Sequence, residues 1–301
     1  MQQSDKQPTL AVLGAGYIGS QLAQEASKKG WNVWALTRNP ERISELSELG
    51  VNTIQARTDD AGWESEMPDQ VNAVVYCASS AARGVEGYRQ SYVDGQKRAL
   101  AWAEARGVQQ YVYTSSTSVY GEAHGKWVDE ESGPWSDTEY AKILLEAEKL
   151  VLSSQVHSAV LRLAGIYGPQ RHLLWDRVAE ATDSRLPGYG DTYLNLIHRD
   201  DCVAAIIALI ATPSSESRVY NLADDDPATR QEIVDWCVGR LNKPRILFDP
   251  EMASLDKRAA RFASGRRPNR RIRADQFKTE IGWKPKYSDF REGYQGIGLG
   301  A

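Results

Sequence analysis

Residues 11–19 read AVLGAGYIG, an apolar run that breaks into Gly14-x-Gly16-x-x-Gly19 and continues as an amphipathic stretch through Lys29. A dinucleotide pyrophosphate needs this order of strand, glycine turn and helix. Gly14 permits the tight turn, Gly16 lets the backbone approach the phosphates, and Gly19 lets helix and strand pack closely. The helix N-terminus adds unpaired N–H groups and a partial positive charge. The same glycines also suit an ordinary strand–helix turn, but the flanking strand and helix favour a nucleotide site.

The composition of the chain narrows its class. The chain has 301 residues and a net charge of −4, with a pI near 5.7, so nothing suggests nucleic acid or an anionic membrane as a partner. The N-terminus (MQQSDKQP) is polar, and no stretch approaches the roughly 20 apolar residues of a membrane helix. Cys77, Cys202 and Cys237 are far apart and have no metal-ligand spacing. We therefore expect a soluble, cytoplasmic α/β protein without a metal site.

Strand and helix patterns alternate through the first half of the chain. The expected strands are continuous apolar runs, typical of a sheet covered on both faces: residues 10–13, 32–36, 52–55, 73–77, 111–114 and 159–163. The expected helices between them are residues 18–29, 40–49, 88–106 and 136–153. This alternation predicts a doubly wound parallel Rossmann sheet with a small C-terminal substrate lobe.

The later segments divide between sheet and lobe. A helix begins near Asp200, and a strand (219–222) and a helix (229–241) follow. We predict an NAD(P)-binding domain over 1–168, completed by about 198–225, and a substrate lobe from 169–197 and 226–301. The crevice between them is the expected ligand site.

The end of the second strand bears on the choice between NAD and NADP. A NAD site usually has a carboxylate there for the ribose 2′-hydroxyl, whereas this chain has Thr37 and Arg38, with Arg42 one helical turn further on. Guanidinium groups bind a 2′-phosphate that a carboxylate would repel, so the sequence favours NADP, with NAD as the alternative. Both arginines also fit a solvated surface. Asp59, after the third strand, is a candidate contact for the adenine.

Further motifs carry a resemblance to a known family. The chain reads VVYCAS at 74–79, GVQQYVYTSSTSVYG at 107–121, LRLAGIYGPQR at 161–171, IHRDDCVAAI at 197–206 and IGWKPKYSDFREG at 281–293. In this order the segments resemble an extended or atypical short-chain dehydrogenase/reductase of the NAD-dependent epimerase/dehydratase family. The resemblance spans nearly the whole chain.

The resemblance implies catalytic roles, and one of them lacks its residue. The family uses a Ser or Thr, a Tyr, and a Lys four residues after the Tyr; by position these are Ser116, Tyr140 and Leu144. The tyrosine transfers a proton as hydride moves to or from the nicotinamide, and the lysine assists it. Lys142 cannot substitute, because two residues along a helix turn it roughly 200° away. Tyr92 also stands where many members have an asparagine that supports a proton-relay water.

The remaining candidate residues follow from the same motifs. Besides the glycines, Thr37, Arg38, Arg42 and Asp59, the expected cofactor contacts are Tyr17, Ile18, Cys77 and Ala78. The expected substrate contacts are Ser79, Ser116, Arg171, His172 and Asn195. His172 and Arg171 are also the nearest alternatives to Tyr140 as the acid, while His198 is expected to be structural.

Residues 257–273 (KRAARFASGRRPNRRIR) carry eight basic side chains and no acid. They suit the edge of a pocket for an anionic substrate such as a nucleotide sugar, or a solvated basic face. We predict an NAD(P)-dependent oxidoreductase or epimerase-like enzyme acting on a secondary hydroxyl or ketone of a polar substrate, for which a nucleotide-linked sugar is one candidate. The alternative is a catalytically inactive NADP-binding redox sensor or interaction protein. The family resemblance also implies a homodimer formed through the helices at 88–106 and 136–153.

Overall fold

The chain folds into two compact units. Unit 1 comprises Met1–Ser116, Lys142–Arg162 and Cys202–Tyr220, and unit 2 comprises Thr117–Ala141, Leu163–Asp201 and Asn221–Ala301. The structure, a computed structural model, describes residues 7–80, 82, 84–133, 135–212, 216–262 and 264–299.

Seven strands form the central sheet. Its order is β12-β7-β5-β4-β1-β2-β3, and the pairings β1–β2, β1–β4, β2–β3 and β4–β5 are parallel. The strands are β1 (Thr9–Leu13), β2 (Asn32–Thr37), β3 (Asn52–Gln55), β4 (Ala73–Tyr76), β5 (Gln110–Ser116), β7 (His157–Leu163) and β12 (Arg218–Leu222). The predicted doubly wound Rossmann sheet is confirmed, and every residue of β1 and β4 is buried.

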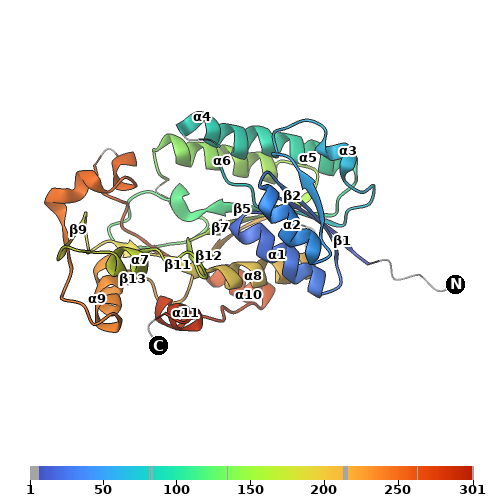
Figure 1. The fold of residues 1–301 in the computed structure, drawn as a ribbon. Coiled ribbons are helices and arrows are strands. Elements are labelled where there is room, and N and C mark those ends of the chain that lie inside the picture. The colour runs from blue at the N-terminus through green and yellow to red at the C-terminus, as the bar shows by residue number, and fades with distance from the viewer. Residues whose placement is uncertain are drawn as a thin grey trace. The chain divides into compact units, whose positions relative to one another are not determined.

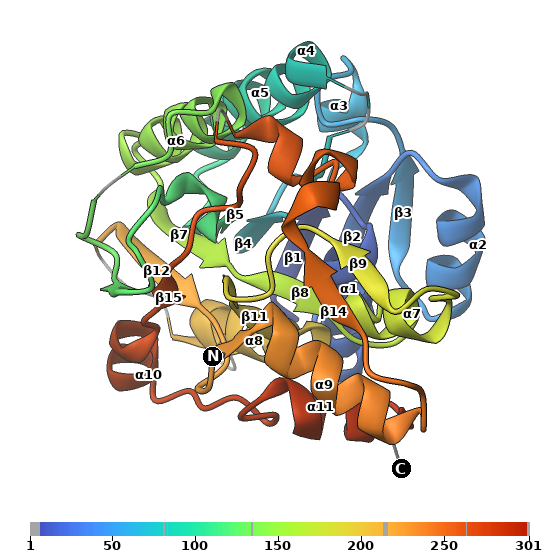
Figure 2. The ribbon, with the colours of Figure 1, turned by 90° about the vertical axis from the view of Figure 1, so that its left-hand side faces the viewer.

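Helices cover both faces of this sheet. Figures 1 and 2 show α4, α5 and α6 on one face and α1, α2 and α8 on the other. Their bounds, with those of the short α3, are α1 (Tyr17–Lys28), α2 (Pro40–Glu48), α3 (Trp63–Glu66), α4 (Gly84–Arg89), α5 (Gly95–Ala105), α6 (Glu139–Leu152) and α8 (Arg199–Ala211). Because β1 lies between β2 and β4, the strand order reverses there, and a doubly wound sheet binds ligands at this switch point.

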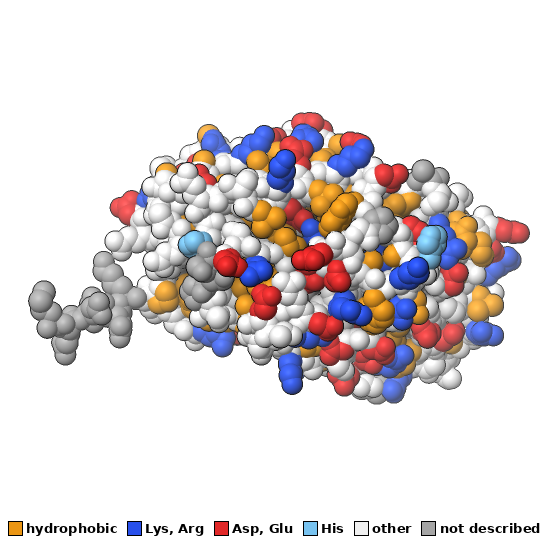
Figure 3. Space-filling view, turned by 180° about the vertical axis from the view of Figure 1, so that it is seen from behind, with side chains coloured by type: hydrophobic (Ala, Val, Ile, Leu, Met, Phe, Trp, Pro, Cys, Tyr) orange, Lys and Arg blue, Asp and Glu red, His pale blue; other side chains and the backbone are white. Residues whose placement is uncertain are grey.

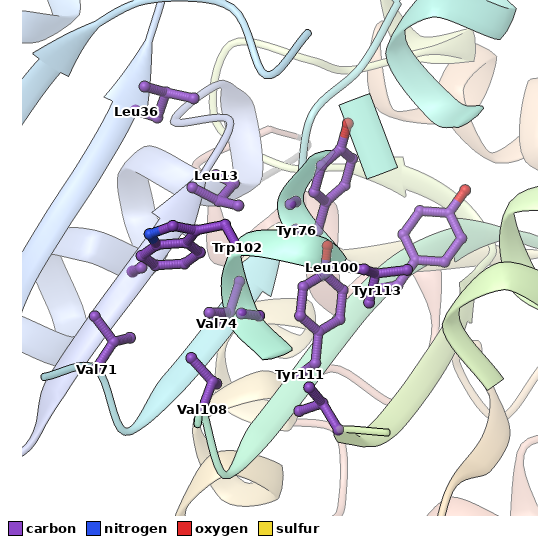
Figure 4. Close-up of a cluster of buried hydrophobic side chains, with 14 of the residues drawn as sticks. Leu13, Leu36, Val71, Val74, Tyr76, Leu100, Trp102, Val108, Tyr111 and Tyr113 are labelled. Carbon is purple, nitrogen blue, oxygen red and sulfur yellow. The ribbon is translucent and has the colours of Figure 1, made fainter. Parts of the chain in front are cut away.

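The core of unit 1 joins the sheet to α5. Val74, Tyr76 and Tyr111 project from the strands and pack with Leu100 and Trp102 of the helix (Figure 4). All five are at most 6% exposed. Full burial of a large apolar side chain contributes roughly 1.5–3 kcal/mol, so this layer fixes α5 against the sheet.

One predicted helix differs from the structure. The sequence predicts a continuous helix over 88–106, whereas α4 and α5 are separated by a π-helical turn, Gln90–Asp94. The buried Tyr76 hydroxyl donates to the Ser91 carbonyl within this turn and shares a hydrogen bond of 2.9 Å with Thr58. A Cβ on Gly95 would lie 2.5 Å from that hydroxyl. The turn accommodates a buried polar group, which helical periodicity alone does not reveal.

Unit 2 is built from short elements. The strands pair as β10–β13, β11–β8, β14–β9 and β15–β6, and Figure 2 shows β9 beside β14 although they are far apart in the sequence. The strands are β6 (Trp127–Val128), β8 (Gly165–Tyr167), β9 (Arg185–Pro187), β10 (Tyr193–Leu194), β11 (Leu196–His198), β13 (Ala228–Thr229), β14 (Leu247–Asp249) and β15 (Arg271–Ile272). The helices are α7 (Leu174–Ala179), α9 (Arg230–Arg240), α10 (Asp275–Ile281) and α11 (Phe290–Gly296), with 3-10 turns at Thr117–Val119, Pro250–Leu255 and Ala259–Arg261.

The surface is mixed in charge. On the face shown in Figure 3, basic and acidic side chains are interspersed, which agrees with the small net charge of −4. Within the described residues, no helix has the length and apolar character needed to cross a bilayer.

A buried ion pair ties three elements of unit 1 together. Glu148 of α6 accepts hydrogen bonds from Arg162 of β7, the shortest at 2.7 Å, and from the Ser115 hydroxyl of β5 at 2.6 Å. The Arg162 and Glu148 side chains are 5% and 3% exposed. With its oxygens bonded in this way, the carboxylate compensates the charge of the guanidinium away from water.

Replacing Glu148 by Ala should lower the free energy of unfolding by about 3–5 kcal/mol, because the buried guanidinium of Arg162 loses the carboxylate that compensates its charge. Glu146→Ala on the same helix removes an exposed partner of Arg89, 2.9 Å away, and should cost at most about 1 kcal/mol. Urea unfolding of both variants measures the difference. Equal losses would contradict this account of the ion pair.

Candidate functional site

The glycine turn after β1 sets the geometry of unit 1 at the switch point. Gly14 has φ +103°, and a Cβ there would lie 2.4 Å from the backbone nitrogen of Ala78. A Cβ on Gly19 would lie 2.3 Å from the Gly14 carbonyl oxygen. Gly16 has no atom within 4 Å of a Cβ position, and no side chain caps α1. The turn therefore needs Gly14 and Gly19 for close packing. The first amides of α1 lie beside Gly16, where there is space for another group.

A cavity of about 290 Å³ opens at the carboxyl ends of β1 to β4. Of the predicted cofactor contacts it is lined by Gly14, Gly16, Tyr17, Thr37, Arg38, Arg42, Asp59, Cys77 and Ala78. Ser79, predicted to contact substrate, also lines it, whereas Ile18 and Gly19 are not among the lining residues. The lining residues that the sequence analysis missed are Ala15, Leu36, Asn39, Ala56, Arg57, Thr58 and Ser91.

Arginines give this cavity its charge. Arg57 holds Asp59 with two hydrogen bonds, Nη2 to Oδ2 at 2.7 Å and Nε to Oδ1 at 3.0 Å. That hydrogen bonding raises the pKa of Arg57 despite its partial burial. Arg42 forms an exposed ion pair of 2.6 Å with Glu45. Among the described residues that line the cavity, Asp59 is the one carboxylate, and it is paired with Arg57. Arg57 adds a third guanidinium to those of Arg38 and Arg42, and its position just after the third strand was the available sequence signal.

The predicted catalytic residues lie in different units. Ser116 is the last residue of β5 in unit 1, next to Ser115 of the buried ion pair. Tyr140 lies in the first turn of α6, in unit 2, and is half-buried. Leu144 is 1% exposed, while Lys142 is exposed. In place of a lysine one helical turn away, Tyr140 has the guanidinium of Arg261 over its ring, with Cζ 4.6 Å from the ring centroid.

Unit 2 contains a second cavity of about 390 Å³, rich in arginine. Five basic side chains and one acidic side chain line it together with apolar residues: Arg177, Arg230, Lys257, Arg258, Arg267, Asp256, Gly165, Leu173, Leu174, Leu194 and Leu255. Three of the five basic residues come from the predicted run 257–273. The sequence analysis missed Arg177 and Arg230, because nothing in a helical pattern shows that an arginine lines a cavity.

Asp256 organises the arginines of this cavity. Its carboxylate accepts from Arg267 at 2.8 Å and from Arg230 at 3.2 Å. Burial alone would raise its pKa, but the hydrogen bonds and charges of Arg267 and Arg230 lower the pKa of Asp256 to about 2. Burial, with Arg267 nearby, lowers the pKa of Arg230 to about 10. A single carboxylate therefore faces an excess of positive charge.

The other predicted substrate residues have structural partners. His172 Nδ1 lies 2.8 Å from Asp176. The Asn195 amide donates to the Arg270 carbonyl at 2.9 Å and accepts from the Ile272 amide at 2.7 Å, so it holds the chain at β15. The positive charge of Arg171 contributes to lowering the pKa of Arg258, after partial burial and Arg267. Arg171 is not among the residues that line the arginine-rich cavity, and its substrate role stays a prediction.

His198 is deeply buried. Its Nδ1 accepts from the Asp200 amide at 3.2 Å, and burial lowers the pKa of His198 to about 4. An imidazole that stays neutral at physiological pH in this setting fits a structural residue of β11.

The sheet order, the glycine turn and the cavity at the switch point together define a Rossmann-type α/β protein. The family model described as NAD dependent epimerase/dehydratase family matches residues 10–223. The chain therefore belongs to the NAD dependent epimerase/dehydratase family.

Similar proteins span most of the chain. Protein YeeZ of Escherichia coli (strain K12) is 27% identical over 254 residues, which cover 82% of this chain and 83% of the relative. A 3-diazoavenalumate denitrifying reductase from a Streptomyces species is 26% identical over 302 residues, 94% of this chain and 97% of the relative. The structure of MoeE5 in complex with UDP-glucuronic acid and NAD has a TM-score of 0.77 and 22% identity, covering 96% of both chains.

Gly14→Ala should destabilise the protein by about 2 kcal/mol or more, because the added Cβ meets the Ala78 backbone and the positive φ is strained. Gly16→Ala should change stability by less than about 1 kcal/mol, because its Cβ enters open space. Urea unfolding of the two variants provides the comparison. If Gly14→Ala is as stable as the wild type, the close approach of Gly14 to the Ala78 backbone does not determine the conformation of the turn.

Proposed function

We propose that the protein is an NADPH-dependent oxidoreductase of its family that acts on a secondary hydroxyl or ketone of an anionic polar substrate. The observation that carries the proposal is the cavity at the carboxyl ends of β1 to β4, where the glycine turn meets three arginines. The arginine-rich cavity of unit 2 supports an anionic substrate.

The residues of the first cavity fit a dinucleotide. The first amides of α1 have no side-chain cap, and a helix N-terminus with its glycine turn attracts a pyrophosphate. Gly16 has room beside it for a group that approaches the backbone closely. When bound, the nicotinamide supplies or accepts a hydride. The chain contributes the anion-binding amides and the walls that orient the cofactor.

The charges of the cavity favour a 2′-phosphate over a bare ribose. The last residue of β2, Thr37, is followed by Arg38, so no carboxylate stands ready for a 2′-hydroxyl. The ion pair with Arg57 compensates the negative charge of Asp59, so Asp59 no longer repels a 2′-phosphate. Arg38, Arg42 and Arg57 then offer guanidinium groups of the kind that bind phosphate bidentately.

NADPH should therefore bind roughly 10–100-fold more tightly than NADH, because a charge-assisted contact is worth about 1.5–3 kcal/mol. Arg38→Ala should remove most of this preference and leave NADH binding unchanged. Arg98→Ala is the matched control, since Arg98 pairs with Glu64 at 3.0 Å and does not line the cavity. Fluorescence titration measures each affinity; equal affinities for the two cofactors, unaffected by Arg38→Ala, would refute NADP preference.

Ser116 and Tyr140 carry the proposed proton chemistry. The Ser116 hydroxyl orients the substrate oxygen, and the Tyr140 hydroxyl gives that oxygen its proton when a ketone is reduced. In the oxidative direction the proton returns to Tyr140. General acid–base help of this kind is worth about 10²–10⁴-fold. Because Leu144 replaces the lysine, Tyr140 lacks the residue that assists proton transfer in the family. The second candidate function is therefore a cofactor-binding sensor without turnover.

The cavity of unit 2 fits an anionic group of the substrate. Arg230 is 2% exposed, and burial lowers the pKa of Arg177, which lines the same cavity. Leu173, also in the lining, has φ 53° and ψ −109°, a rare backbone conformation that clusters at ligand sites. Excess positive charge in a partly buried cavity favours a bound carboxylate or phosphate. The same fold in MoeE5 is described with UDP-glucuronic acid, a nucleotide sugar.

A panel of ketones and keto-sugars with and without an anionic group should identify substrates by the oxidation of NADPH. Tyr140→Phe should lower kcat by roughly 10²-fold or more. Arg177→Met should raise KM for the anionic substrates about tenfold with little change in kcat. Arg185→Met is the control, because Arg185 is exposed and paired with Asp249 at 3.0 Å. NADPH binding with no turnover anywhere in the panel would favour the sensor over the enzyme.

A further inference from the structure

The partner of the Tyr140 ring is the basis of this inference. The Arg261 guanidinium carbon lies 4.6 Å from the centroid of that ring, within the range of a cation–π contact. In the described chain no carboxylate forms an ion pair with Arg261. The guanidinium therefore presents a full positive charge to the aromatic ring whose hydroxyl is proposed to carry the proton.

A short segment connects this arginine to the arginine-rich cavity. Lys257 and Arg258 line the cavity, and the 3-10 turn Ala259–Arg261 follows directly. The Asp256 carboxylate accepts from the backbone N–H groups of Arg258 at 3.1 Å and of Ala259 at 3.3 Å. Ala259 is 2% exposed. The carboxylate that gathers the cavity arginines thus also anchors the turn that carries Arg261.

We propose that Arg261 is a positioning residue that supplies, through Tyr140, the positive charge that Leu144 cannot provide. This inference rests on the proposed function. A cation close to an ionisable group favours negative charge on that group, so the proposed role of Arg261 is to favour the negative charge that Tyr140 carries during the reaction. When an alcohol is oxidised, its O–H proton passes to the phenolate oxygen and its carbinol carbon loses a hydride to the nicotinamide ring. The C–O bond becomes a carbonyl, and NADP⁺ is reduced to NADPH.

The two residues of α6 that follow Tyr140 most closely on the family pattern, Lys142 and Leu144, are poorer sources of this positive charge. Leu144 has no charge, and Lys142 lies two residues along α6, where the helix turns it roughly 200° away from Tyr140. An arginine stays protonated across the whole working pH range, unlike a lysine whose charge is lost when it is buried. The contribution of Arg261 should therefore persist from acid to alkaline pH.

The chain offers a matched control. Arg266 lies over the ring of Tyr189 with its guanidinium carbon also 4.6 Å from the ring centroid. Arg266 pairs with Asp191 at 2.6 Å and does not line the arginine-rich cavity. Arg266→Met removes the same kind of cation–π contact from a different tyrosine, Tyr189.

The experiment measures kcat/KM for oxidation of the best alcohol against pH, with NADP⁺, for wild type, Arg261→Met, Arg261→Lys and Arg266→Met. Arg261→Met should move the rising limb of the profile to higher pH by about one unit or more and lower kcat near pH 7 at least tenfold. Arg261→Lys should keep most of the wild-type profile, and Arg266→Met should match wild type. The Arg261→Met effect should vanish in a Tyr140→Phe background.

A second readout needs no turnover. The tyrosinate absorbance of each protein is titrated with pH, and the Tyr140→Phe curve is subtracted to isolate Tyr140. Arg261→Met should shift the isolated curve to higher pH. An unmoved curve and an unmoved rate profile would overturn the role of Arg261 while leaving a Tyr140-dependent oxidoreductase intact. Turnover that is indifferent to Tyr140→Phe, or no turnover at all, would overturn this inference together with the proposed proton chemistry.

Discussion

The close approach of the turn after β1 to the turn after β4 is the constraint on which unit 1 depends. A side chain at Gly14 would collide with the Ala78 backbone at 2.4 Å, so only glycine allows the two turns to meet. This contact fixes where α1 begins and how its first amides face the cavity at the switch point. The parallel sheet and its covering helices place the ends of β2 and β3 around the same cavity, where their arginines collect.

Each of the two cavities has more positive than negative side chains in its lining, and this charge supports the proposed ligands. In unit 1, Arg57 pairs with Asp59 and leaves the cavity with a positive surplus that suits the extra phosphate of NADP. In unit 2, Asp256 gathers Arg230 and Arg267 and anchors the turn that carries Arg261. The family lysine after the tyrosine is absent, and a cation from a different segment lies over the Tyr140 ring instead. Loss of one motif residue therefore does not by itself decide between an enzyme and a sensor.

Local patterns in the sequence were sufficient to predict the sheet. Continuous apolar runs and the glycine triplet predicted the central strands to within two residues at either end, and nine cofactor candidates line the first cavity. The π-helical turn at Gln90–Asp94 escaped prediction because it accommodates the Tyr76 hydroxyl, a contact between distant residues. Arg230 and Arg261 were missed as site residues for the same reason, because their partners Asp256 and Tyr140 lie far away in the sequence. Arg57 was missed although its partner Asp59 is only two residues away.

The most direct test of the account is a crystal structure of the protein grown with NADPH. We predict the pyrophosphate against the first amides of α1 beside Gly16, and the 2′-phosphate within hydrogen-bonding distance of Arg38 or Arg57. NADPH bound with its 2′-phosphate directed to solvent, away from these arginines, would contradict the proposed cofactor preference. A ligand located elsewhere, with the glycine turn not contacting it, would contradict the dinucleotide site itself.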